Sequence, residues 1–157
     1  MRRFYGAEQM LFVASGAVEH GDVVKRVEVG LGYLSNARTA TREAPCWTAG
    51  RKVVKRDLEQ SHIVFGLPAK AATAPDRFAL MALSTLYGGG MSSRLFQQLR
   101  ERRGLCYSVF SFASLYSDSG CFSVYAGTSA DQANEMLLVA LDELGSIVHS
   151  VTSDEVA

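Results

Sequence analysis

The sequence has little of what marks the specialised classes of protein. It carries no net charge, with 16 basic and 16 acidic residues among 157, which argues against a nucleic-acid or anionic-membrane footprint over the whole surface. No apolar run approaches the roughly 20 residues that a membrane-spanning helix needs, and no signal-peptide pattern opens the chain. We therefore expect a soluble protein without a nucleic-acid or membrane partner.

Cysteine is scarce as well. The three cysteines, Cys46, Cys106 and Cys121, have no CxxC spacing, so they support neither a disulfide framework nor a zinc knuckle. If the last two predicted strands form a hairpin, Cys121 lies opposite about Ser114, and this register disfavours a bridge to Cys106. We expect reduced, packed thiols, which favours a reducing compartment, the cytoplasm if the protein is bacterial.

The residues that are present fit one globular domain, because 48% of them are hydrophobic. Apolar runs predict short strands at 10–14, 53–58 and 62–67, and helical spacing predicts a helix over 22–34. A Pro-Asp start predicts a second helix over 76–87. This helix is apolar nearly all round, so we expect it to be sandwiched in the interior.

The second half continues the same mixture of elements. Residues 105–116 and 120–128 predict two strands joined by a turn at 117–120, and Ser129 with Gln132 offers a capping box for a long amphipathic helix. The order of elements predicts an α+β fold, a two-layer sandwich of a mostly antiparallel sheet with helices on one face. Both chain ends resemble interrupted helices, so we interpret residues 1–157 as a single domain truncated at both ends.

The most informative stretch lies between these halves and reads GGGMSSRLFQQLRERRGLCY over residues 88–107. Three glycines, Gly88, Gly89 and Gly90, permit positive φ and close backbone approach, so the chain can reverse there. Ser92 or Ser93 can then cap a short helix. Its buried face is expected to consist of Met91, Leu95 and Leu99.

Two polar residues follow on that helix and the next strand. Arg100 lies near the predicted helix end and Tyr107 at the start of the strand, so the two could converge across one turn. From these two residues without further context, we expect Arg100 to be a solvated charge at the helix end and Tyr107 to pack in the sheet. The surrounding cluster of Arg94, Arg100, Arg102 and Arg103 could attract an acidic peptide or nucleic acid, but its polar neighbours favour a solvated face.

This stretch closely resembles the second-domain signature of the pitrilysin/insulinase family of zinc metallopeptidases, which includes mitochondrial processing peptidase and its bacterial relatives. The resemblance extends over almost the whole chain, from Tyr-Gly-Ala-Glu-Gln-Met at residues 5–10 to the last helix. It implies the same α+β architecture and identifies the chain as the family's second, inactive domain, which binds no zinc.

The resemblance also implies roles for individual residues. Arg100 and Tyr107 match a paired arginine and tyrosine that hold the substrate backbone and stabilise charge on the scissile carbonyl, completing a site in another domain. Their chemistry suits this, because a guanidinium is a permanent donor and a phenol can donate to an oxyanion. Gly88, Gly89 and Gly90 match a loop associated with substrate handling, here in its short form.

The family's zinc motif, HxxEH, is missing. Glu19 and His20 copy its last two letters, but Gly16 occupies the place of the first histidine, and His62 and His149 lie far away in the sequence. We therefore expect no metal on this chain and no activity from it alone. Zinc is expected in a missing catalytic domain.

Our leading interpretation is the non-catalytic domain of a zinc metalloendopeptidase, which closes the peptide chamber and contributes substrate and transition-state contacts. The expected partners are a peptide substrate and a catalytic zinc domain in the same or another chain, within a homo- or hetero-oligomer. The alternative is a structural or partner subunit, a scaffold protein that shares the fold without catalysis.

Overall fold

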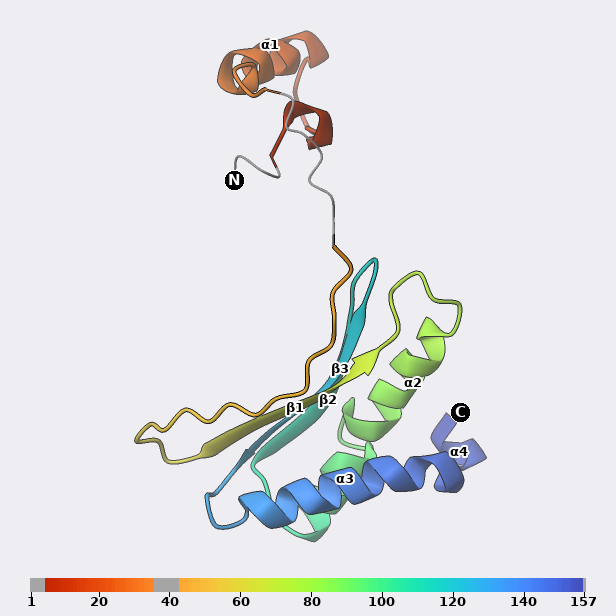
Figure 1. Cartoon of the computed structure of the whole chain (residues 1–157). Helices are drawn as coiled ribbons and strands as arrows, with labels where there is room; N and C mark the ends of the chain where they lie inside the picture. The colour runs from red at the N-terminus through yellow and green to blue at the C-terminus, as the bar shows by residue number, and fades with distance from the viewer. Residues whose placement is uncertain (1–4, 36–42, 157) are drawn as a thin grey trace. The chain divides into compact units, whose positions relative to one another are not determined.

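The structure is a computed structural model that describes residues 5–35 and 43–156. The chain divides into two compact units, Met1–Glu43 and Ala44–Ala157 (Figure 1). The expectation of a single domain truncated at both ends stays a prediction. No helix among the described residues is both long and apolar enough to cross a membrane.

The first unit contains one turn of 3-10 helix, η1 (Ala7–Gln9), and one α-helix, α1 (His20–Leu31). The helix predicted over 22–34 is confirmed with shifted ends, and the amide of Gly32 closes it on the carbonyl of Glu28 at 2.8 Å. The strand predicted at 10–14 is wrong, because these residues are irregular. An apolar run indicates an extended segment, but a strand also needs a hydrogen-bonded partner. Residues 36–42, which follow this helix, lie outside the described residues.

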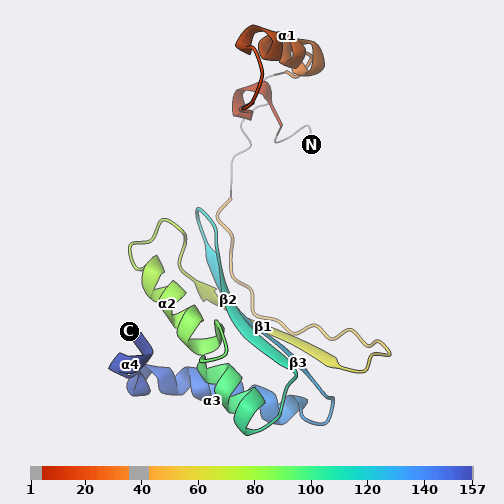
Figure 2. The same cartoon turned by 180° about the vertical axis from the view of Figure 1, so that it is seen from behind.

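The second unit is built on a three-stranded antiparallel sheet of β1 (Ser61–Ala69), β2 (Ser108–Leu115) and β3 (Gly120–Thr128), in the order β1-β3-β2. The hairpin predicted between the last two strands is confirmed, and Ser114 pairs with Cys121 as expected (Figure 2). All three cysteines are free thiols. The compartment inferred from them stays a prediction.

A second strand was predicted at 53–58, either hairpin-paired with the strand at 62–67 or beside it. This prediction is wrong, because residues 51–58 are irregular and only the later segment, as β1, enters the sheet. Val53 and Val54 are 65% and 62% exposed. Their β-branched side chains suit a strand, but no ladder of hydrogen bonds forms around them in the described chain.

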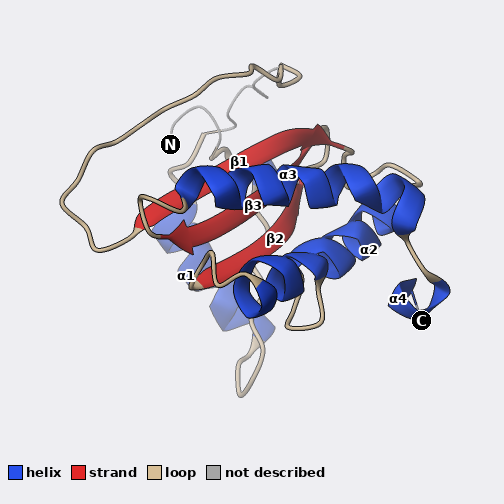
Figure 3. Cartoon of the chain, turned by 90° about the horizontal axis from the view of Figure 1, so that it is seen from below, coloured by secondary structure: helices blue, strands red, loops and turns tan. Residues whose placement is uncertain are grey.

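Helices cover one face of this sheet and confirm the predicted α+β two-layer arrangement. They are α2 (Arg77–Gly88), the short helix η2 (Phe96–Arg102) and α3 (Ala133–Ser150), with a last turn α4 (Ser153–Val156) at the end of the chain. Figure 3 shows α2 and α3 side by side over the strands. The core between the layers includes the fully buried side chains of Tyr87, Leu95, Leu99, Val124 and Met136.

Tyr87 joins two of the helices inside this core. Its hydroxyl donates a hydrogen bond to the carbonyl of Ala140, so α2 is tied to α3. Burial, and secondarily the charge of Glu143, raises the pKa of the Tyr87 phenol above its ordinary value. The hydroxyl therefore keeps the proton that it donates.

The buried faces of the helices are narrower than predicted. α2 is not sandwiched: it buries Tyr87 and Gly88, while Phe78 is 62% exposed, because the second unit has no third layer among its described residues to cover it. In α3 the buried stripe includes Ile147 but not Val148, which is 77% exposed. The predicted capping box does not form, since the hydroxyl of Ser129 reaches the side chain of Gln132, not a backbone amide.

The other face of the sheet carries an aromatic row. Tyr125 of β3 stacks on Phe110 of β2 with ring centroids 4.9 Å apart, and Phe112 follows at 5.9 Å from Phe110. On β1, Nδ1 of His62 lies 2.8 Å from the hydroxyl oxygen of Tyr125. This hydrogen bond gives one ring nitrogen of His62 a partner within the sheet.

A charged clasp joins Arg94, two residues before the short helix, to the last turn α4. The guanidinium of Arg94 binds both carboxylate oxygens of Glu155 at 2.7 and 2.8 Å and donates to the hydroxyl of Ser150 at 2.7 Å. Glu155 also accepts the backbone amide of Thr152 at 3.0 Å. These hydrogen bonds, chiefly that from Arg94, lower the pKa of Glu155 from its ordinary 4.5 to about 2.

We expect the clasp to make the stability of the chain depend on acid pH. Because the folded pKa of Glu155 lies below its unfolded value, the clasp stabilises the fold fully above about pH 4.5 and loses this effect as the pH falls towards 2. Glu155→Gln should therefore lower Tm near neutral pH and flatten the fall of Tm below pH 5, measured by thermal unfolding. Glu59→Gln, at an exposed position, should follow the wild-type curve. Equal slopes for wild type and Glu155→Gln would contradict the role of the clasp.

Candidate functional site

The candidate site begins where α2 ends against β2. A Cβ atom on Gly88 would lie 2.5 Å from the backbone nitrogen of Ser111, which no side chain tolerates without a shift. The hydroxyl of Ser111 donates to the carbonyl of Ser84 at 2.7 Å, so the helix end and the strand are joined at this point. The predicted close backbone approach is confirmed at Gly88.

The close approach extends to Gly89, where a Cβ atom would lie 2.6 Å from the Cα of Thr85, but the predicted positive φ is absent at all three glycines. Positive φ values occur only at Gly16 and Gly104 among the described residues, so the reversal after α2 does not use the left-handed region. Gly90 is exposed with open space around its Cα, and its carbonyl accepts the amide and the hydroxyl of Ser93. The side chain of Ser93 therefore closes the glycine loop and does not cap the helix.

The short helix that follows is a π-helix, a rare form that is frequent at functional sites. Leu95 and Leu99 are fully buried and hold one face of η2 against the sheet and α3, as predicted. Met91 was expected on the same face but is 75% exposed. It precedes the helix, in a turn where its own carbonyl accepts the side-chain amide Nε2 of Gln97 at 2.8 Å, so helical spacing does not apply to it.

Gly104 turns the chain from the end of η2 towards β2. Its φ of +61° lies in the left-handed region, and its amide bonds to the carbonyl of Arg100 at 3.2 Å, the pattern of a helix end closed by glycine. The next amide, that of Leu105, reaches the carbonyl of Leu99 at 2.7 Å. Arg100 and Tyr107 therefore lie on either side of a tightly closed turn.

The segment after this turn is anchored to the end of β3. The hydroxyl of Thr128, which is fully buried, donates to the carbonyl of Leu105 at 2.6 Å. The amide of Tyr107 donates to the carbonyl of Gly127 at 2.8 Å. Thr128 could not be identified from the sequence, because nothing in the local pattern links it to a carbonyl 23 positions away.

The side chains of Arg100 and Tyr107 both reach solvent from the anchored backbone around this turn. Tyr107 is 62% exposed, and the guanidinium carbon of Arg100 lies 4.8 Å from the ring centroid of Phe96. Burial raises the pKa of the Cys106 thiol, and the positive charge of Arg100 opposes this rise. Arg100 therefore acts electrostatically on Cys106, the residue directly before Tyr107. No hydrogen bond joins Arg100 to Tyr107 within the described chain, so their predicted convergence stays a prediction.

The arginine cluster does not act as one uniform solvated face. Arg94 is occupied by Glu155 and Ser150, and Arg103 lies 3.9 Å from a carboxylate oxygen of Glu135. Arg100 and Arg102 are exposed and have no ion-pair partner among residues 5–35 and 43–156. Of these two, only Arg100 stacks on an aromatic ring of the described chain.

The donor set does not fit a zinc ion. His20 opens α1, His62 lies in β1 and His149 lies in the last turn of α3. No group of three or more histidine, cysteine, aspartate or glutamate side chains in the described parts of the chain could hold a metal ion. No catalytic step can therefore be assigned to a metal on these residues.

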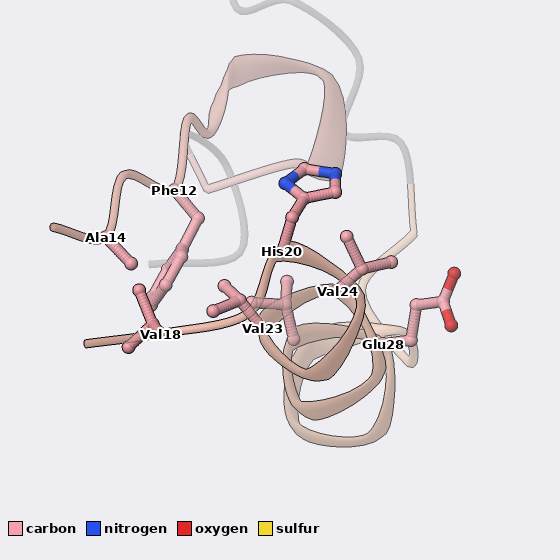
Figure 4. A pocket seen from close by; sticks show the side chains of 8 residues that line it. Phe12, Ala14, Val18, His20, Val23, Val24 and Glu28 are labelled. Carbon is pink, nitrogen blue, oxygen red and sulfur yellow. The ribbon is translucent and has the colours of Figure 1, made fainter. Parts of the chain in front are cut away.

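One cavity, of about 310 Å³, lies within the first unit between residues 12–18 and α1 (Figure 4). Its walls are mainly the apolar side chains of Phe12, Ala14, Val18, Val23, Val24 and Val27. Only His20 and Glu28 in its lining can ionise, and Figure 4 shows the carboxylate of Glu28 pointing away from Phe12 and Val18. The cavity offers no pairing of catalytic groups.

Known proteins resemble the chain over most of its length. The family model described as "Peptidase M16 inactive domain" matches residues 1–157. An uncharacterised zinc protease of Streptomyces coelicolor is 37% identical over 99% of this chain and 36% of its own length. A crystal structure of a peptidase M16 inactive domain from Pseudomonas fluorescens matches with a TM-score of 0.68 and 22% identity, covering 88% of this chain and 34% of that one.

A further solved neighbour belongs to a different kind of assembly. A chain of complex III2 from Candida albicans matches with a TM-score of 0.70 and 15% identity, covering 88% of this chain and 36% of that one. At such identities the two structural likenesses show the fold alone. The chain spans about a third of the length of the curated relatives that it matches.

Two glycines of the loop, Gly88 and Gly90, give a matched test of the close approach at Gly88. Gly88→Ala should lower the free energy of unfolding by about 1–3 kcal/mol, because the new methyl meets the backbone of Ser111. Gly90→Ala should change it by less than about 0.5 kcal/mol, because nothing lies within 4 Å of the added atom. Urea unfolding of the two variants measures the difference, and equal stabilities would contradict the packing described.

Thr128 provides a second test, which concerns how the segment after the Gly104 turn is anchored. Thr128→Val keeps the shape of the side chain but leaves the buried carbonyl of Leu105 without its donor, which should cost about 1–3 kcal/mol in urea unfolding. Thr73→Val is the control, because Thr73 is exposed and the one hydrogen bond of its side chain to another described residue is long, at 3.4 Å. If both variants were equally stable, Thr128 would not anchor the segment.

Proposed function

The chain belongs to the peptidase M16 family, the pitrilysin/insulinase metallopeptidases, as an inactive domain, and from this premise we propose that it is the substrate-binding, non-catalytic half of a zinc metalloendopeptidase. In this function it closes the chamber that holds a peptide and presents Arg100 and Tyr107 to it. The proposal concerns the longer protein, of which the chain corresponds to about a third in curated relatives.

The observation that carries this proposal is the contrast between Arg100 and Arg94. Arg94 has its donors bound to Glu155 and Ser150, whereas Arg100 is exposed with no carboxylate partner among the described residues. A permanently charged guanidinium held at a rigid turn with unoccupied donors is suited to bind a carbonyl or carboxylate from outside.

The chemistry of the pair fits the hydrolysis of a peptide bond. When water adds to the scissile carbonyl, negative charge develops on its oxygen, and donors placed beforehand stabilise that charge. The hydroxyl of Tyr107 supplies one donor and the guanidinium of Arg100 supplies others. Both residues come from backbone anchored through η2 and β3, so little reorganisation is needed when the charge forms.

The glycine loop is proposed to border the bound peptide. Gly89 and Gly90 are exposed, and no atom of the described chain lies within 4 Å of a Cβ position on Gly90. An extended peptide can therefore approach the backbone at Gly90 closely. Gly88 has a structural part, since its missing side chain lets α2 meet β2.

The zinc ion is proposed to reside in a separate catalytic domain, on the same polypeptide or on a partner subunit of a homo- or hetero-oligomer. Relatives named as zinc proteases are about three times as long as the region matched here, which leaves room for such a domain. The histidines of this chain are too scattered to provide the site.

A second candidate function is that of a structural or partner subunit. The likeness to a chain of complex III2 favours it, because that neighbour has the same fold in a large assembly. A scaffold needs the buried core but has no use for an exposed Arg100 and Tyr107. The contribution of these side chains to peptide turnover therefore separates the two functions.

The test uses the full-length parent protein. Tyr107→Phe and Arg100→Ala should each lower kcat/KM for a peptide substrate on the order of 100-fold, because each removes a donor to the developing charge. Zinc content and thermal stability should stay unchanged, since both side chains are exposed.

Matched controls are available for both variants. Tyr116→Phe removes the hydroxyl of another exposed tyrosine, and Arg102→Ala removes a neighbouring exposed charge. Neither control should lower turnover by more than about twofold. Turnover that depends on Arg100 and Tyr107 no more than on these controls would favour the scaffold function.

A further inference from the structure

The guanidinium of Arg100 is held by an aromatic ring and not by an acid. Its central carbon lies 4.8 Å from the ring centroid of Phe96, four residues earlier on η2. This distance is within the range of a cation–π contact. Within the described residues, no aspartate or glutamate pairs with Arg100.

A ring and a carboxylate constrain an arginine in different ways. A carboxylate binds the N–H groups at the edge of the guanidinium, as Glu155 does with Nε and Nη2 of Arg94. An aromatic ring contacts the flat face of the guanidinium and leaves the N–H groups in its plane open. Stacking therefore orients the side chain without using the donors that a substrate would need.

We propose that Phe96 is a positioning residue for Arg100, and that its ring holds the guanidinium ready for a peptide carbonyl while leaving its donors free. The inference rests on the proposed function of Arg100. It extends that function to a residue that does not itself touch the peptide.

The surroundings of Phe96 make it a suitable platform. Phe96 is half-buried and opens the π-helical segment directly after the fully buried Leu95. Leu99, also fully buried, fixes the next turn of the same helix. The backbone that carries the ring is therefore fixed by buried neighbours on both sides, and Arg100 lies against the ring.

Arg102 provides the internal comparison. It lies on the same helix and is also exposed without an ion-pair partner in the described chain, but no ring of the described residues lies under it. An unsupported arginine samples many rotamers and must give them up on binding. Arg100 loses less conformational entropy on binding, because the ring of Phe96 already restricts its side chain.

The first experiment observes the contact directly in the full-length protein, labelled with 15N and 13C at arginine. The ring of Phe96 should shift the side-chain resonances of Arg100 upfield. Phe96→Leu should abolish the shift and Phe96→Tyr should keep it, while the resonances of Arg102 should stay unchanged in both variants. Unchanged Arg100 resonances in Phe96→Leu would overturn the proposal whatever the activity.

The second experiment measures the consequence for peptide turnover. Phe96→Leu should lower kcat/KM by about three- to tenfold, the size expected for losing one cation–π contact, and Phe96→Tyr should restore it. In the background of Arg100→Ala, Phe96→Leu should cause no further loss. An equal loss in both backgrounds would show that Phe96 acts through packing alone and would overturn the proposal.

The outcomes separate this inference from the function on which it rests. If Arg100→Ala leaves turnover unchanged, the proposed function of Arg100 fails. If Arg100→Ala lowers turnover but Phe96→Leu does not, only the positioning role of Phe96 fails.

Discussion

The second unit depends on the burial of one face of a small sheet. The strands β2 and β3 supply Val109, Phe122 and Val124 from one side, and helices supply Tyr87, Leu99 and Met136 from the other. Removing this apolar surface from water is the dominant favourable term, and it requires the helices to lie at fixed places over the strands. Every part of the candidate site lies in the segments that connect the helical layer to the sheet. The glycine loop, η2 and the turn at Gly104 lead from α2 into β2 in 19 residues, from 89 to 107.

This route explains why the site can be exposed and still rigid. Leu95 and Leu99 are buried one turn apart, so the helix that carries Arg100 cannot rotate without exposing them. Thr128 and Gly127 fix the backbone before and at Tyr107. The side chains of Arg100 and Tyr107 reach solvent from a backbone that is anchored on both sides. Their exposure therefore does not imply disorder, and it leaves them available to a ligand.

The sequence predicts this architecture best where the pattern is local. The strands at β2 and β3, their hairpin, and the pairing of Ser114 with Cys121 follow from turn residues and alternation. The segments at 10–14 and 53–58 are predicted as strands but are irregular in the structure. An apolar run shows that a segment suits a strand, but it does not show which other strand would hydrogen-bond to it. The same limit applies at the site. The closeness of Gly88 to Ser111 could be foreseen as a possibility, whereas Thr128 and the clasp between Arg94 and Glu155 join residues too far apart in sequence to be paired by inspection.

The arrangement of the sheet has a practical consequence for handling this protein. β1 and β2 each pair only with β3 in the described chain, so both outer strands present unpaired amides and carbonyls. The aromatic row of Phe110, Phe112 and Tyr125 lies beside them, and Phe110 is 46% exposed. Open strand edges next to apolar side chains are templates for self-association. Low protein concentration and a check for oligomers therefore belong in any preparation of residues 1–157 on their own.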